Sequence, residues 1–131
     1  EGTLNENGIM GYGRKGMRIY DFGWVRQAKG WGNGADSFMR LQLHSTDPLQ
    51  LEWKLGTPQS KGCIRVPATF NAFLDHFGIL DADYERRIAE GKKLWVMSPD
   101  REPTPWSGRY MVIVDSNRQE RPSWSPVPAN K

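Results

Sequence analysis

Two side chains in this sequence have the types that thiol-based acyl transfer requires, Cys63 and His44. Cys63 is the only cysteine among the 131 residues, and His44 lies upstream of it. A single sulfur cannot form a disulfide within the chain, whereas a cysteine beside a glycine, with a histidine available, provides a nucleophile and its base. A lone cysteine is most often a small buried packing residue. The neighbouring residues therefore have to decide between the two interpretations.

The residues around the thiol favour the chemical interpretation. The cysteine lies in the sequence Ser60-Lys61-Gly62-Cys63-Ile64-Arg65. Gly62 allows a tight turn and a close approach of substrate, and the N–H groups of Lys61, Gly62 and Cys63 could converge on the oxyanion of an acyl transfer. On a strand, Arg65 would project to the same side as Cys63, where its guanidinium could hold a carboxylate. An ordinary ion pair is the alternative role for this arginine.

A predicted strand positions the histidine. Residues 38–44 place Met39, Leu41 and Leu43 alternately with polar side chains, which is the period of a half-buried strand. His44 ends this strand on its polar face and is therefore the candidate base. Residues 45–59 follow as a long connection containing two prolines. Connections of this length are often functional.

The remaining segments predict a strand-rich domain with two helices. Phe70, Phe73, Leu74 and Phe77 have the spacing of an apolar helix face, and Gly78 is a suitable end for that helix. The other expected elements are one or two strands over 16–27 broken at Gly23, a glycine-rich loop over 29–36, short strands over 64–66 and 92–97, a helix over 82–90 with Asp81 as cap and Gly91 as its end, a loop over 98–108, and a strand over 109–115 that is buried on both faces in its middle.

The totals limit the size of the protein and the class of partner. A length of 131 residues allows one compact domain, which we expect over residues 1–116, followed by a polar, proline-containing tail over 117–131. The opening residues 1–16 read as irregular, and the short stretch before His44 leaves open whether every strand of the domain lies within this sequence. The formal charge of +3 comes without a Lys/Arg stripe, so nucleic acid is not an expected partner. No apolar run approaches the roughly 20 residues that cross a bilayer.

The motif resembles the signature of the YkuD-type L,D-transpeptidases. In that family a histidine is followed, after a gap of similar length, by Ser or Thr, then His, Gly, Cys, an apolar residue, and Asn or Arg. His44 and five of the six later positions match, and Lys61 replaces the second histidine. The resemblance covers His44–Arg65, and the other predicted strands are compatible with it.

The resemblance implies a mainly β, β-rich α+β domain of the L,D-transpeptidase β-sandwich type, with two short helices after the nucleophile. It also implies a role for each residue of the motif region. The implied site comprises Cys63 as the acylated nucleophile and His44 as its base; Lys61, Gly62 and Ser60 around the oxyanion and the pocket; and Arg65, Ser45 and Trp53 toward the substrate, with Ser45 supplying a carbonyl that orients the imidazole.

The implied reaction belongs to cell-wall biogenesis. Cys63 would attack the L,D peptide bond of a peptidoglycan tetrapeptide stem and release the terminal D-alanine. An amine would then resolve the acyl-enzyme and form a crosslink, which makes the protein an acyltransferase, or water would resolve it. Family members use no metal or organic cofactor and are typically inactivated by carbapenems. The resemblance further implies a location in the bacterial cell envelope, periplasmic or extracytoplasmic, and we expect a monomer.

Several alternatives stay open on the same residues. Within the fold, the chain could be an L,D-carboxypeptidase or an amidase; outside catalysis, it could be a wall-binding module with an inert thiol. Ser60 fits a turn hydrogen-bonder better than a chemical participant, and His76 has no expected role. Trp31 and Trp53 fall in loops beside the predicted site, where they could line a groove, although tryptophan is more often a core residue.

Other cysteine and histidine chemistries fit the sequence poorly. A papain-like protease has its histidine downstream of the cysteine, and here the order is reversed. A cysteine-based phosphatase requires an arginine where this chain has Thr69. One cysteine and two histidines without close spacing are too few for a zinc site.

Overall fold

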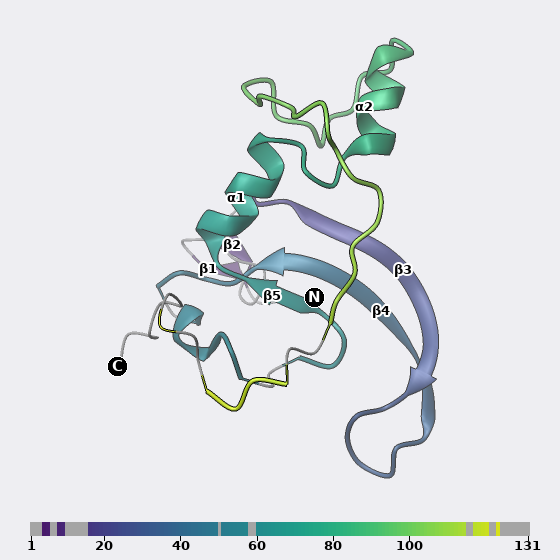
Figure 1. Cartoon of the computed structure of the whole chain (residues 1–131), viewed down its shortest axis with the longest axis vertical. Helices are drawn as coiled ribbons and strands as arrows, with labels where there is room; N and C mark the ends of the chain where they lie inside the picture. Colours follow the sequence, from purple (N-terminus) through teal and green to yellow (C-terminus); the bar gives the residue numbers. More distant parts are fainter. Residues whose placement is uncertain are drawn as a thin grey trace. The chain divides into compact units, whose positions relative to one another are not determined.

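The computed structural model describes residues 4–5, 8–9, 16–49, 51–57, 60–114, 117–120 and 123. They form an α+β arrangement with a three-stranded mixed sheet and two α-helices (Figure 1). Two compact units are present, residues 1–72 and 73–131. The elements are β1 (Leu4–Asn5), β2 (Gly8–Ile9), β3 (Ile19–Ala28), β4 (Asp36–Ser45), the 3-10 helix η1 (Glu52–Lys54), β5 (Ile64–Val66), α1 (Ala68–His76) and α2 (Ala82–Ala89).

The sheet follows the order β3-β4-β5 and is the frame of the first unit. β3 and β4 are long antiparallel neighbours joined by the predicted glycine-rich loop, and β5 lies parallel to β4 (Figure 1). The register shifts between Asp21 and Gly23, where the Gly23 N–H donates to Asp21 Oδ1 at 2.9 Å. The expected break at Gly23 is therefore a β-bulge within one continuous strand, because a bulge absorbs the extra residue and leaves the pairing on both sides intact.

One face of this sheet holds the buried apolar side chains. The pairings Tyr20 with Leu43 and Ser45 with Val66 place these residues on the same side as Met39. Tyr20, Met39, Leu43 and Val66 are each less than 9% exposed. The alternation predicted for residues 38–44 is thereby confirmed, and the opposite face carries polar side chains together with the exposed Trp24 and Phe38.

Helix α1 is tied to the sheet through one buried amide. Asn71 has no exposed surface; its Oδ1 accepts from the Arg18 N–H at 3.1 Å and its Nδ2 donates to the Arg18 carbonyl at 2.9 Å. At the start of the helix, the Ala68 N–H donates to Glu52 Oε1 at 2.7 Å, which satisfies one of the unpaired donors of the first turn. The helix after Pro67 that the sequence predicts is present, and its position is fixed by polar contacts as well as by packing.

The buried stripe of α1 differs from the predicted one. Phe70 and Phe73 are 46% and 48% exposed, so the expectation that both face the core is wrong. The buried positions are Ala68, Asn71 and Leu74, which recur at the i, i+3 spacing of one helix face. A polar residue occupies the centre of that face, and hydrophobicity alone could not reveal it.

Both helices end as the sequence predicts, at glycines. After α1, the Ile79 N–H donates to the Leu74 carbonyl and the Gly78 N–H to the Asp75 carbonyl, the two bonds of a Schellman motif. Gly78 has φ +57°, which L side chains rarely adopt. Asp81 precedes α2 as predicted, but its side chain makes no capping hydrogen bond.

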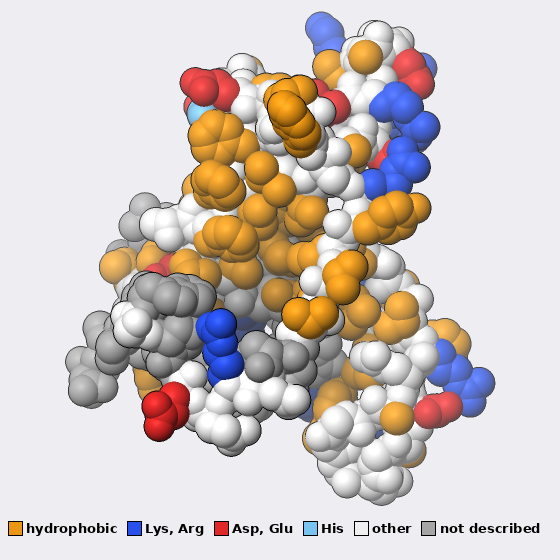
Figure 2. Space-filling model, viewed as in Figure 1, with side chains coloured by type: hydrophobic (Ala, Val, Ile, Leu, Met, Phe, Trp, Pro, Cys, Tyr) orange, Lys and Arg blue, Asp and Glu red, His pale blue; other side chains and the backbone are white. Residues whose placement is uncertain are grey.

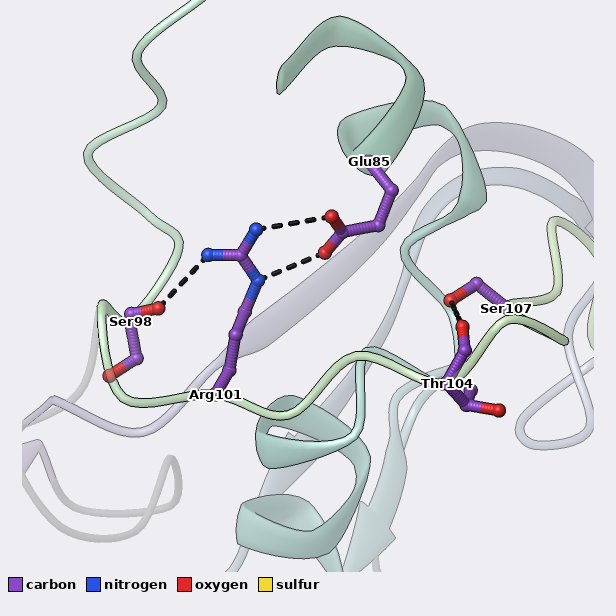
Figure 3. Close-up of polar contacts among 5 residues, drawn as sticks. All are labelled: Glu85, Ser98, Arg101, Thr104 and Ser107. Carbon is purple, nitrogen blue, oxygen red and sulfur yellow. Dashed lines mark hydrogen bonds and ion pairs between the residues drawn. The ribbon is translucent and has the colours of Figure 1, made fainter. Parts of the chain in front are cut away.

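A bidentate ion pair organises the second unit. From the loop at 98–108, Arg101 donates through Nε and Nη2 to the two carboxylate oxygens of Glu85, at 2.9 and 3.1 Å, and through Nη1 to the Ser98 carbonyl at 3.0 Å (Figure 3). Ser107 Oγ donates to the Thr104 carbonyl at 3.0 Å within the same loop. The predicted loop is thus held against α2 by charge-assisted hydrogen bonds.

Two predicted strands do not form in the described residues. Within 92–97 the Met97 N–H donates to the Leu94 carbonyl, which closes a turn. Residues 109–114 have no strand partner, and the side chains of Tyr110, Val112, Ile113 and Val114 are 65–83% exposed. Figure 2 shows hydrophobic side chains reaching the surface over the face drawn. A segment with strand propensity joins a sheet only where a neighbouring strand pairs with its backbone. The prediction of a buried strand over 109–115 is therefore wrong for residues 109–114.

Some predictions concern residues that the structure does not describe. The last residue of that expected strand, Asp115, lies outside the described residues, as do 121–122 and 124–131 of the predicted tail. In the opening segment, expected to be irregular, the described residues pair as the short antiparallel strands β1 and β2. Among the described helices, none combines the length and the hydropathy that a bilayer crossing requires.

We predict that Asn71→Ala lowers the free energy of unfolding by about 2 to 4 kcal/mol, because it removes two hydrogen bonds and leaves the Arg18 backbone groups unsatisfied. Urea unfolding followed by circular dichroism measures this difference. Thr69→Ala, at an exposed position of the same helix, should stay within about 0.5 kcal/mol of the parent. A free energy for Asn71→Ala as close to the parent as that of Thr69→Ala would show that the amide does not hold the helix.

Candidate functional site

The pairing of β4 with β5 gathers four polar side chains on one face. His44 pairs with Arg65 in parallel register, and the Thr46 N–H donates to the Val66 carbonyl at 2.9 Å just beyond the strand. Because alternate residues of a strand share a face, Thr46 lies on the face of His44 and Cys63 on that of Arg65. All four are opposite the buried Leu43. The predicted nucleophile and base therefore lie on adjacent strands and on the same side of the sheet.

A tight turn positions the thiol at the start of β5. Gly62 has φ +145°, a conformation that L side chains rarely adopt, so a glycine suits this turn, and a Cβ at this position would lie 3.3 Å from Leu41 Cδ2 of β4. Ser60 Oγ accepts from the Gly62 N–H at 3.1 Å and donates to the Cys63 carbonyl. Ser60 is thus a turn hydrogen-bonder, as the sequence predicts. The Gly62 N–H is engaged by Ser60 Oγ in this structure, and the convergence of the Lys61, Gly62 and Cys63 N–H groups on an oxyanion stays a prediction.

The imidazole of His44 is held by the next residue. Its Nδ1 lies 2.7 Å from the Ser45 carbonyl oxygen. A carbonyl can only accept, so Nδ1 carries the proton, and Nε2 is the nitrogen of the neutral ring that can take up a proton. The contact expected between Ser45 and the imidazole is present. His44 is only 4% exposed, which differs from the solvated polar face that alternation predicts, because the end of β4 is covered on both sides.

Burial also sets the protonation state of this histidine. Removal from water lowers the pKa of His44 from its ordinary 6.5, the Ser45 carbonyl bond opposes this effect, and the positive charge of Arg65 lowers the pKa further. Desolvation and a neighbouring cation both disfavour the imidazolium. At neutral pH the ring is therefore uncharged and able to accept a proton.

The connection after His44 is shaped by a buried acid, Asp47. Asp47 has no exposed surface; its Oδ1 accepts from the Leu49 N–H at 2.9 Å, and its carbonyl accepts from the Leu51 and Glu52 N–H groups. Glu52 in turn holds the start of α1. Sequence reasoning missed both Thr46 and Asp47. The signal was the uninterrupted polar run from His44 to Asp47 directly after an apolar strand.

A pocket of about 240 Å³ lies between this connection and the start of β5. It falls below the 300–1,000 Å³ typical of sites for whole small molecules, so it suits one residue-sized part of a larger ligand. Its described lining residues are Thr46, Leu51, Lys54, Leu55, Gly56, Thr57, Ser60, Cys63 and Arg65.

The structure places the predicted site residues in three environments. Cys63, Ser60 and Arg65 line the pocket, whereas His44 is buried on the same face of the sheet. The Lys61 ammonium lies 5.7 Å from the centre of the Trp31 ring, and neither side chain lines the pocket. Trp53 is 44% exposed, and Lys54 Nζ lies 5.2 Å from the centre of its ring. Lys54 lines the pocket, whereas Trp53 is not among the lining residues.

The site offers thiol and imidazole chemistry. Cys63 is a free, partly buried thiol. Within the part of the chain that the structure describes, no cluster of three or more His, Cys, Asp or Glu residues could hold a metal ion. Comparison with known proteins finds no family model that matches this chain and no curated protein that resembles it.

We predict that His44 titrates below pH 6.5, and that Arg65→Met raises its pKa because the substitution removes a neighbouring positive charge. NMR titration of the imidazole carbons measures both values, and a His76→Gln variant identifies the signals. Since the folded pKa lies below the unfolded value, the unfolded state binds the proton more readily. The stability linked to His44 is complete above pH 6.5 and is lost as the pH falls through 6.5 toward the folded pKa. A His44 pKa at or above 6.5 would contradict the buried, neutral ring.

Proposed function

We propose that this chain is the catalytic domain of a YkuD-type L,D-transpeptidase that acts on peptidoglycan tetrapeptide stems in the bacterial cell envelope. The proposal includes the β-sandwich of that family, with the sheet β3-β4-β5 as one part of it. The observation that carries the proposal is the orientation of His44. A ring that donates from Nδ1 to the Ser45 carbonyl, on the face of the sheet that carries Cys63, has the arrangement of a base serving a thiol.

Three further observations support this function. The lowered pKa of His44 keeps the base unprotonated at neutral pH, where a general base has to work. The pocket beside Cys63 has room for one residue-sized group, as the terminal residue of a peptide stem requires. The Ser60–Gly62 turn fixes the backbone on the N-terminal side of the thiol, which gives the nucleophile a defined position.

Acylation proceeds with His44 as the proton carrier. Nε2 takes the thiol proton while Cys63 Sγ attacks the carbonyl carbon of the L,D peptide bond. The N–H groups of Lys61 and Cys63 are the backbone donors available to the resulting oxyanion. When the tetrahedral intermediate collapses, the carbon–nitrogen bond breaks, and the imidazolium gives its proton to the departing amine of D-alanine. The product is a thioester on Cys63.

Deacylation repeats these steps with a second nucleophile. An acceptor amine attacks the thioester carbonyl, His44 removes the amine proton, and the Cys63 thiolate leaves and regains that proton from the imidazolium. Water in place of the amine yields the hydrolysed tripeptide. The acceptor therefore decides between transpeptidase and carboxypeptidase, and both share the first half of the reaction.

We predict that a carbapenem forms a one-to-one covalent adduct with the protein and that Cys63→Ala abolishes it. Intact-mass spectrometry detects the adduct, and the same samples are then tested with a tetrapeptide-containing muropeptide. Crosslinked dimers support the transpeptidase, and tripeptide alone indicates the carboxypeptidase. An adduct that persists in Cys63→Ala would remove the nucleophile assignment. No adduct and no product, with binding retained, would favour a wall-binding module.

We predict that His44→Ala slows carbapenem acylation by about 10²- to 10⁴-fold, the range that positioned general bases contribute. Stopped-flow absorbance at the β-lactam band follows the reaction. His76→Ala, which removes the other histidine, is the matched control and should acylate at the parental rate. Equal rates for His44→Ala and the parent would show that another group deprotonates the thiol.

A further inference from the structure

Arg65 lines the pocket of Cys63 and has no hydrogen-bond or ion-pair partner in the part of the chain that the structure describes. Its side chain is partly buried, and its Nε has no exposed surface. No described residue forms an ion pair or a hydrogen bond with its guanidinium. A charge removed from water without an anion is costly, and arginines in such positions normally face a carboxylate. Among the described residues, no carboxylate occupies the position facing this guanidinium.

Thr46 repeats the pattern on the neighbouring strand. It lines the same pocket, is 1% exposed, and its Oγ1 has no hydrogen-bond partner among the described residues. Buried hydroxyl groups are normally satisfied. Thr46 and Arg65 lie on the same face of the sheet, one on each side of the β4–β5 pairing.

The charge of the pocket indicates which ligand would satisfy these groups. Among its described lining residues, Lys54 and Arg65 are cationic and none is acidic. Guanidinium and ammonium groups are hydrogen-bond donors only, and a hydroxyl can also donate. The complementary ligand is a negatively charged group that only accepts hydrogen bonds. A carboxylate is such a group, and its planar shape matches that of a guanidinium.

We infer that Arg65, together with Thr46 and Lys54, forms a carboxylate-binding subsite beside the Cys63 thiol, which selects acyl donors that carry a free carboxylate next to the bond attacked. The assignment of this ligand as an acyl donor rests on the proposed function, whereas the anion preference of the pocket does not. Arg65 and Thr46 are then specificity-determining residues, and Lys54 adds a second positive charge to the lining.

Two alkylating agents test the subsite without turnover. Iodoacetate and iodoacetamide transfer nearly isosteric groups to a thiolate, but only iodoacetate carries a carboxylate. The ratio of their rates with Cys63 is independent of the fraction of thiolate, because both agents react with the same species. The urea-unfolded chain, alkylated at the same cysteine, gives the intrinsic ratio. Intact-mass spectrometry follows each reaction.

We expect the iodoacetate-to-iodoacetamide ratio of the folded protein to exceed that of the unfolded chain by about tenfold, the effect of one charge-assisted hydrogen bond. Arg65→Gln should return the ratio to the unfolded value, and Thr46→Val should reduce it part of the way. Lys29→Gln removes a cation of the same unit whose side chain does not line the pocket, so this variant should keep the parental ratio.

Three results would overturn the inference. The first is a parental ratio equal to that of the unfolded chain, and the second is an unchanged ratio in folded Arg65→Gln. The third is an equal loss in Arg65→Gln and Lys29→Gln, which would indicate general electrostatic attraction. Protection of the parent protein provides a test that needs no variant. N-acetyl-D-alanine should slow alkylation by iodoacetamide, and N-acetyl-D-alaninamide at the same concentration should not; protection by both or by neither also contradicts the subsite.

The subsite and the proposed function fail in different measurements. Failure of carbapenem to acylate Cys63 removes the transpeptidase proposal and leaves the alkylation ratio intact. Loss of the iodoacetate preference removes the carboxylate subsite and leaves acylation by carbapenem to be observed.

Discussion

The parallel pairing of β4 with β5 is the constraint on which the site depends, since it determines which side chains meet. In the register observed, His44 lies opposite Arg65, and both Cys63 and Thr46 fall on the same face. A shift of one residue would turn every side chain of β5 to the other face and would bury the thiol among Leu43 and Met39. The Thr46 hydrogen bond to Val66 continues this register just beyond β4, and at the start of β5 a Cβ on Gly62 would already meet Leu41. Backbone geometry therefore decides which side chains share the candidate site.

Burial then gives the polar face its properties. The run from His44 to Asp47 is almost entirely removed from solvent. His44 donates to the Ser45 carbonyl, and Asp47 accepts from the backbone of the following loop. The Thr46 hydroxyl is the one side chain of this run with no hydrogen-bond partner among the described residues. The same burial keeps the imidazole neutral, and no acid among the described residues compensates Arg65. A partly buried cation that lacks an anion is expensive in a purely structural core, whereas a neutral imidazole can accept a proton. Together they are properties that the proposed function requires.

Local sequence patterns predicted the central strands of the first unit and the helix and loop of the second, but not which other segments of the second unit form strands. The alternation of Met39, Leu41 and Leu43 located β4, and the glycines at 62 and 78 located a turn and a helix end. The role of Ser60 also followed from its type and spacing. Residues 109–114 have equally strong strand propensity, but pairing depends on neighbours that are distant in sequence, and the described residues offer none. Thr46, Asn71 and Asp47 could not be predicted from hydrophobicity, because buried polar residues are positioned by particular hydrogen bonds.

The pH dependence of acylation provides the decisive measurement of whether Cys63 and His44 act as a pair. We predict that the second-order rate of carbapenem acylation has an acid limb with an apparent pKa below 6.5, and that this limb moves upward in Arg65→Met, since the rate then follows the neutral form of His44. The contrary result is a rate without an acid limb below pH 6.5 that follows one and the same ionisation in the parent, in Arg65→Met and in His44→Ala. That result would contradict the pairing of the Cys63 thiol with the His44 imidazole.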